Sequence, residues 1–119
     1  MPMPILIALL LSVNATLWGG EHVEMQLTKG GAQLEFDCAK GTITEPLSPD
    51  SLGRFRAKGT FTTEHGGPVR QGEVSQAVEA TYTGDMNDDA MTLQLIVGDN
   101  ELARFILKRG EHGKLRKCR

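Results

Sequence analysis

The amino-acid sequence predicts an all-β protein built as an up-and-down meander of seven or eight strands. Two observations carry this prediction. Apolar and polar side chains alternate with a period of two through most of the chain, whereas the periodicity of an amphipathic helix is nearly absent. Clusters of Gly, Pro, Asn and Asp separate the short alternating runs and favour connections of hairpin length.

Individual strands can be placed from these runs. A glycine-containing turn at 29–31 separates the first two runs, and Pro46 and Pro49 end the third, because proline cannot join a central ladder. The acidic segment 85–89 and the segment 98–100 are turn signals of the same kind. The predicted strands are 23–28, 34–38, 41–44, 54–61, 78–83, 91–97, 103–107 and 115–118.

A small closed barrel is the most economical arrangement of such a meander, because closure removes unpaired edge strands. The interior of this barrel would hold Phe36, Phe55, Tyr82, Leu93 and Phe105 together. A β-sandwich is the alternative. Its immunoglobulin form is disfavoured, because the only tryptophan precedes both cysteines instead of lying between them.

The N-terminal residues have the composition of a secretory signal peptide. Residues 1–15 carry no charged side chain and contain the apolar run 5–11, followed by small residues where a signal peptidase cleaves. The run is shorter than the ~20 apolar residues that a membrane-spanning helix needs. We therefore expect a signal peptide over 1–15 and one all-β domain over 16–119. The protein would be secreted or periplasmic and not embedded in the membrane.

Cys38 and Cys118 are the only cysteines. Exported proteins meet an oxidising environment, so we predict that the two form a disulfide bond. Both lie in runs with a strand pattern, 34–38 and 115–118, and the bond would join those strands. A redox role is not expected, because the chain has no Cys-x-x-Cys motif and no histidine next to either thiol.

The sole tryptophan, Trp18, directly follows the predicted signal peptide. Gly19 and Gly20 carry no side chains, so the backbone can turn sharply into the first strand. In a barrel, the indole could fold under one end and plug it, with the guanidinium groups of Arg109 and Arg116 stacked over it. The alternative is a loose chain end with an exposed indole.

Several short motifs in a fixed order resemble uncharacterised bacterial exported proteins over the whole mature chain. They are Trp18-Gly19-Gly20, residues 35–43, Gly53-Arg54-Phe55, residues 66–69, Tyr82-Thr83-Gly84 and the terminal Cys118. More distantly, an N-terminal tryptophan, a meander and a disulfide reaching the C-terminus resemble the lipocalin and calycin plan. That resemblance implies a barrel that holds a small ligand, although here the glycines follow the tryptophan instead of preceding it.

The most site-like cluster consists of Glu64, His65 and Arg70 around a Gly-Gly-Pro loop, which is the longest loop signal in the chain. These side chains could bind an anion or transfer protons. No nucleophile with a base and an orienting group lies nearby in the sequence, so no catalytic residue is assigned. The alternative is a polar hairpin tip.

Neither a metal nor a cofactor is predicted. His22, His65 and His112 lie far apart and lack paired ligand spacing, and the acidic segment 85–89 lacks the glycine and final glutamate of a calcium loop. The net charge of −2 does not favour a nucleic-acid partner.

Together, these patterns predict an exported non-enzymatic binding module. It would hold a small apolar molecule inside the barrel or engage a protein partner through the loop 64–71. The alternatives are a purely structural or inhibitory exported protein, and an enzyme that uses Glu64, His65 and Arg70.

Overall fold

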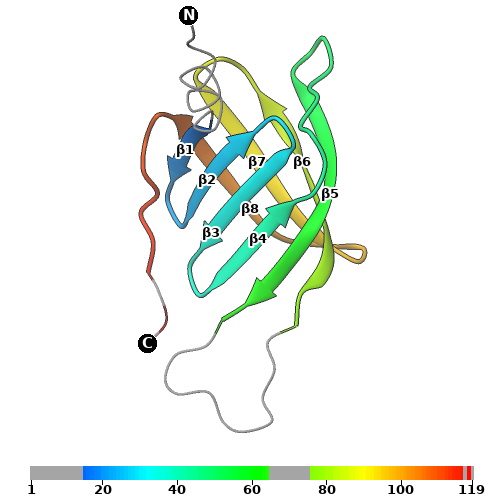
Figure 1. Ribbon diagram of the computed structural model, residues 1–119, viewed down its shortest axis with the longest axis vertical. Helices are drawn as coiled ribbons and strands as arrows, with labels where there is room; N and C mark the ends of the chain where they lie inside the picture. Colours follow the sequence, from blue (N-terminus) through cyan, green and yellow to red (C-terminus); the bar gives the residue numbers. More distant parts are fainter. Residues whose placement is uncertain (1–14, 65–75, 117, 119) are drawn as a thin grey trace, which may run out of the picture.

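The computed structural model describes residues 15–64, 76–116 and 118, and they form a closed antiparallel β-barrel in which the strands follow chain order (Figure 1). The prediction of an up-and-down barrel is confirmed, and the sandwich alternative is wrong. The predicted signal peptide lies outside the described residues, except for Ala15. The strands are β1 (Thr16–Gly20), β2 (Val23–Thr28), β3 (Gly31–Phe36), β4 (Ala39–Ile43), β5 (Arg54–Thr63), β6 (Val78–Met86), β7 (Ala90–Val97) and β8 (Asn100–Arg109).

Two of the strand assignments from the sequence are corrected at the ends of the chain. β1 was not predicted as a strand, yet it pairs with β2 along its whole length and closes the barrel against β8. Its two glycines hide the alternation, because they present no side chain to either face. The predicted strand 115–118 does not form. Its described residues 115, 116 and 118 belong to no strand, and a parallel bridge between Glu21 and Lys114 directly precedes them.

Inward-facing side chains form one continuous hydrophobic core, as the period-two alternation requires. Phe36, Phe55, Tyr82 and Leu93 are buried in this core, and Phe105 is partly buried against it. The predicted common interior is therefore confirmed. The remaining buried members are Trp18, Val23, Met25, Ala32, Leu34, Ala39, Ile43, Ala57, Ala80, Met91, Leu95 and Leu107.

The centre of the barrel is filled by its own side chains. Val23, Met25, Tyr82, Leu93 and Leu107 each have 0% exposed surface. An internal void large enough for a water molecule would leave accessible surface on the residues around it. The packing at these five residues therefore leaves no room for a ligand between them.

The two halves of the barrel differ in strand length. β1 to β4 have 5 or 6 residues each, whereas β5 to β8 have 8 to 10. As a result, β4 pairs with β5 only from Gly59 to Thr63, and β1 pairs with β8 only at Lys108 and Arg109. The long hairpin of β7 and β8 projects past the short strands at the lower right of Figure 1. One stretch of β5 and one stretch of β8 thus extend beyond the neighbouring strand.

After β8 the chain crosses the outer side of β1 and β2, and we name residues 111–116 and 118 the C-terminal strap (Figure 1, red). The Lys114 N–H donates to the Gly20 carbonyl at 3.0 Å, and the His22 N–H donates to the Lys114 carbonyl at 2.9 Å. The Gly113 N–H donates to a Glu24 carboxylate oxygen at 2.9 Å. The strap is therefore held to the barrel by several hydrogen bonds.

The disulfide between Cys38 and Cys118 forms as predicted, with the two Cα atoms 5.0 Å apart. Its setting differs from the expected one. Cys38 lies in the turn between β3 and β4 with φ of 55°, and Cys118 lies outside every strand, so the bond ties the strap to a turn. Such a bond indicates an oxidising, extracytoplasmic environment. Within the described residues, no helix is long and apolar enough to cross a membrane.

Candidate functional site

Three phenylalanines meet near the end of the barrel that holds the β3–β4 turn. The ring centroid of Phe36 lies 5.8 Å from that of Phe61 and 5.1 Å from that of Phe105. Phe36 is buried, whereas Phe61 and Phe105 are only partly buried. We name these three residues the aromatic mouth, because they carry apolar surface from the filled core to the solvent.

Small residues on β4 make room for these rings. Ala39 pairs with Phe36 and Gly41 pairs with Phe61 in the neighbouring ladders. A Cβ atom at Gly41 would collide with the Tyr82 hydroxyl and come within 3.2 Å of the Phe36 ring. The Tyr82 hydroxyl donates to the Thr60 carbonyl at 2.7 Å, so the one buried phenol below the mouth is satisfied.

The predicted binding residue Glu64 lies against the β3–β4 turn, which follows the strand that carries Phe36. It directly follows β5, and its N–H donates to the Cys38 carbonyl at 2.8 Å, which fixes the start of the connection against the β3–β4 turn. His65 and Arg70 lie outside the described residues. Their convergence with Glu64 on an anion therefore stays a prediction.

A histidine–carboxylate pair that the sequence analysis did not anticipate lies beside the disulfide. His22 Nδ1 is 2.5 Å from Asp37 Oδ2. The Arg116 N–H also donates to Asp37, at 2.7 Å, and the hydrogen bonds from Arg116 and His22 hold the pKa of this carboxyl below its usual value. The adjacent sulfur of Cys38 is in the disulfide and cannot act as a nucleophile. The pair thus anchors the strap. Its members are 15 positions apart in the chain, so no motif could reveal it.

Trp18 is buried in the core at 2% exposed surface. Its Nε1 atom has no hydrogen-bond partner among the described residues. Arg109 is the residue opposite Trp18 in the β1–β8 ladder, but its guanidinium points to the Asp88 carbonyl at 3.5 Å. Arg116 is exposed on the strap. Stacking of either guanidinium on the indole stays a prediction.

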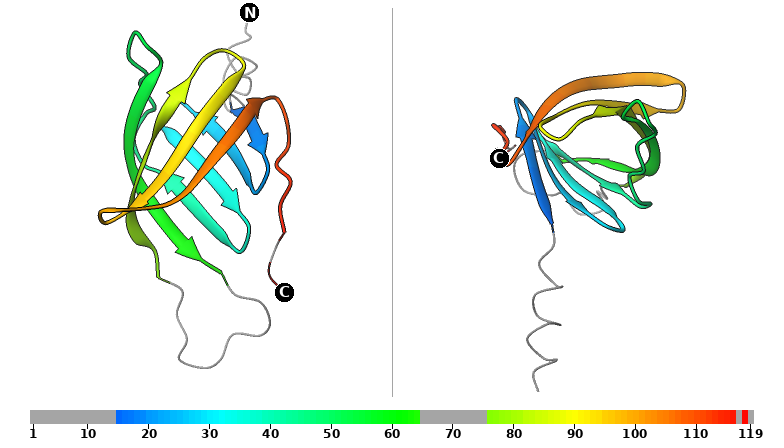
Figure 2. Two further views of the ribbon diagram at one scale, coloured as in Figure 1. Left: turned by 180° about the vertical axis from the view of Figure 1, so that it is seen from behind. Right: turned by 90° about the horizontal axis from the view of Figure 1, so that it is seen from above.

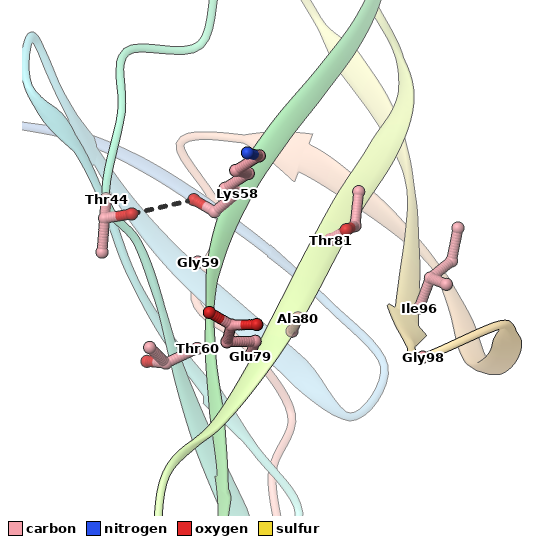
Figure 3. Close-up of a pocket in the computed structure, with 9 residues that line it drawn as sticks. All are labelled: Thr44, Lys58, Gly59, Thr60, Glu79, Ala80, Thr81, Ile96 and Gly98. Atoms are coloured by element: carbon pink, nitrogen blue, oxygen red, sulfur yellow. Dashed lines mark hydrogen bonds between the residues drawn. The ribbon is translucent and has the colours of Figure 1, made fainter.

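A hollow with a volume of about 450 Å³ lies on the outer faces of β5 and β6 (Figure 3). Its lining includes Lys58, Thr60, Glu79 and Thr81. The Thr44 hydroxyl at its border donates to the Lys58 carbonyl at 3.1 Å, as the dashed line shows. Ala80 and Ile96 also line this hollow, so its lining is mixed, and it lies on the opposite face of the sheet from the aromatic mouth.

Among the described residues, no group of three or more His, Cys, Asp and Glu side chains is arranged to hold a metal ion. Comparison with known proteins identifies no relative: no family model matches the chain, and neither a curated protein nor a solved structure matches it significantly.

Proposed function

We propose that the protein is an exported, non-enzymatic binding module that takes an apolar group of its ligand at the aromatic mouth. The observation that carries this proposal is that Phe61 and Phe105 remain partly exposed, whereas interior residues such as Met25, Tyr82 and Leu93 have no exposed surface. Exposed aromatic surface gathered at one end of a rigid barrel is typical of a ligand site.

The disulfide supports the compartment in this proposal, because such a bond persists outside the reducing cytosol. The protein would act in the periplasm or after secretion. The filled centre favours a ligand that rests on the mouth over one that is enclosed deep inside. The binding energy would come mainly from apolar surface, at roughly 25 cal/mol per Å² removed from water.

The test is titration of the purified protein with N-phenyl-1-naphthylamine, a neutral apolar dye that fluoresces when it leaves water. Phe61→Ala should weaken dye binding by about tenfold, because an aromatic contact is worth roughly 1 to 2 kcal/mol here. Phe55→Ala is the matched control, since Phe55 is a buried residue of the same strand that lies outside the mouth.

The two variants separate loss of the site from loss of stability. Both remove a phenyl ring that packs on the core, so both should lower the melting temperature. Only Phe61→Ala should lower the affinity for the dye. Equal affinity in the two variants, or no dye binding by the unmodified protein, would contradict the proposal.

A further inference from the structure

The strand β8 has one side that no strand of the described residues covers. Its ladder with β7 runs from Asn100 to Lys108, whereas its ladder with β1 includes only Lys108 and Arg109. We name Asn100–Phe105 the open edge. Figure 2 (left) shows this stretch running past the end of β1 on the back of the barrel. An uncovered strand edge presents backbone donors and acceptors that can pair with another chain.

β5 also extends beyond its neighbouring strand, and there the β4–β5 connection forms hydrogen bonds with the backbone of the overhang. The Lys58 carbonyl accepts the Thr44 N–H at 3.0 Å, and the Lys58 N–H donates to Glu45 at 2.8 Å. The Arg54 carbonyl accepts the Asp50 N–H at 2.9 Å, and the Arg54 N–H donates to Asp50 at 2.9 Å. The β4–β5 connection therefore provides partners for the backbones of Lys58 and Arg54 from within the chain.

The direction of the backbone groups on β8 follows from its alternation. The Arg109 N–H donates to the Asp89 carbonyl, on the β7 side. Because these directions alternate along a strand, the groups of Lys108, Ile106 and Arg104 point to the other side. Lys108 meets Gly19 of β1, and the Ile106 carbonyl lies against Gly20. Within the described part of the chain, no partner is found for the backbone of Arg104.

Apolar side chains flank Arg104 on both faces of β8. Ile106 is 67% exposed and Leu102 is 53% exposed on the outside, and Phe105 belongs to the aromatic mouth on the inside. The charge of Arg104 is balanced within the strand by Glu101, at 2.9 Å. A strand placed against this edge would thus have apolar neighbours for side chains on either of its faces.

We infer that the open edge of β8 binds an extended, apolar segment of a partner polypeptide, which adds as one more strand to the sheet. Main-chain hydrogen bonds would supply affinity, and contacts with Phe105 and Ile106 would favour valine and isoleucine in the segment. This inference rests on the proposed function, because one face of the added strand would lie on the aromatic mouth. It names the ligand as a peptide.

The probe is a blocked, fluorescein-labelled peptide of alternating valine and threonine. Its control is the same peptide with proline at the central valine, which keeps the apolar character and prevents strand pairing. Fluorescence anisotropy should show binding of the first peptide, with about tenfold or weaker binding of the second, because at least one main-chain hydrogen bond is lost and the strand is bent.

The matched protein variants are Arg104→Pro and Arg104→Ala. Proline removes an N–H that points away from β7, so the barrel should keep its β7–β8 ladder. Arg104→Pro should weaken peptide binding by about tenfold, whereas Arg104→Ala should leave it unchanged. If the proline variant does not fold, hydrogen exchange of the unmodified protein replaces it, and the peptide should then protect the Arg104 amide.

The outcomes distinguish this inference from the proposed function. If the naphthylamine dye binds and the valine–threonine peptide does not, the open edge is refuted and the aromatic mouth stands. Equal binding of the two peptides, or of the two Arg104 variants, also refutes strand addition. A concentration-dependent dimer that Arg104→Pro abolishes would overturn the inference in favour of a second copy of the chain.

Discussion

Removal of the disulfide should destabilise the barrel strongly. The double variant Cys38→Ser/Cys118→Ser leaves no unpaired thiol and keeps the hydrogen bonds that hold the strap. The bond joins residues with a sequence separation of 80. In the chain-entropy model, a loop of that length contributes about 4 to 5 kcal/mol, because the bond restricts the unfolded chain. For a domain of this size, that loss corresponds to a decrease in melting temperature of about 20 °C.

Urea unfolding is the appropriate assay, because Trp18 is the only tryptophan and is buried in the native core. Its fluorescence therefore reports the loss of the barrel directly. The double variant should unfold at a lower midpoint, and the unmodified protein in excess dithiothreitol should match it. The urea dependence should be steeper without the bond, because the unfolded chain exposes more surface.

The outcome that would refute the reasoning is a difference in unfolding free energy below about 1 kcal/mol between the oxidised protein and the double variant. Such a result would mean that the unfolded chain is already compact, or that the native barrel relaxes when the strap is released. Protection of the Lys114 amide from hydrogen exchange would separate these two causes, because that amide loses protection only if the strap detaches.

Three further predictions follow from buried or crowded groups. Trp18→Ala should lower the unfolding free energy by about 3 to 5 kcal/mol, and acrylamide should quench the native indole poorly; free quenching would contradict its burial. Burial raises the pKa of Tyr82, the only tyrosine, so its phenol should stay neutral until the barrel unfolds. The contribution of the neutral phenol to the free energy of unfolding is complete below pH ~10, where the phenol of the unfolded chain ionises, and it is lost as the pH rises further. A reversible titration of Tyr82 near pH ~10 with unchanged circular dichroism would refute this prediction. Gly19→Ala should lower the free energy of unfolding by about 1 to 3 kcal/mol, because the new Cβ collides with the Glu111 carbonyl of the strap. Gly30→Ala is the control, because a Cβ at that position meets open space. Equal melting temperatures of the two variants would count against the contact between Gly19 and the strap.

Period-two alternation was sufficient to predict most strands, because a half-buried strand must place every second side chain in the core. β7 illustrates this, since Met91, Leu93 and Leu95 are all buried. The same signal failed for β1. Gly19 and Gly20 fill inner and outer positions without any contrast in hydrophobicity, so the strand that closes the barrel was not visible. The predicted strand at 115–118 failed for the opposite reason, because an alternating run can also lie extended on a surface.

The candidate site was predictable only in part. The sequence placed a long connection after Thr63, and the N–H of Glu64, directly after β5, donates to the Cys38 carbonyl in the β3–β4 turn. The mouth itself joins rings from β3, β5 and β8, and it depends on which strands are adjacent and in what register. His22 and Asp37 likewise meet only because the turn before β2 and the turn after β3 lie at the same end of the barrel.

The all-β class, the meander, most of the core and the pairing of the only two cysteines could all be predicted from the sequence. These properties depend on local hydrophobic contrast and on the lack of any other thiol. The length over which each strand is paired, and hence the extension of β8 past β1, depends on the folded arrangement of the strands. Side-chain alternation predicts which face of a strand is buried, but it does not predict where the neighbouring strand ends.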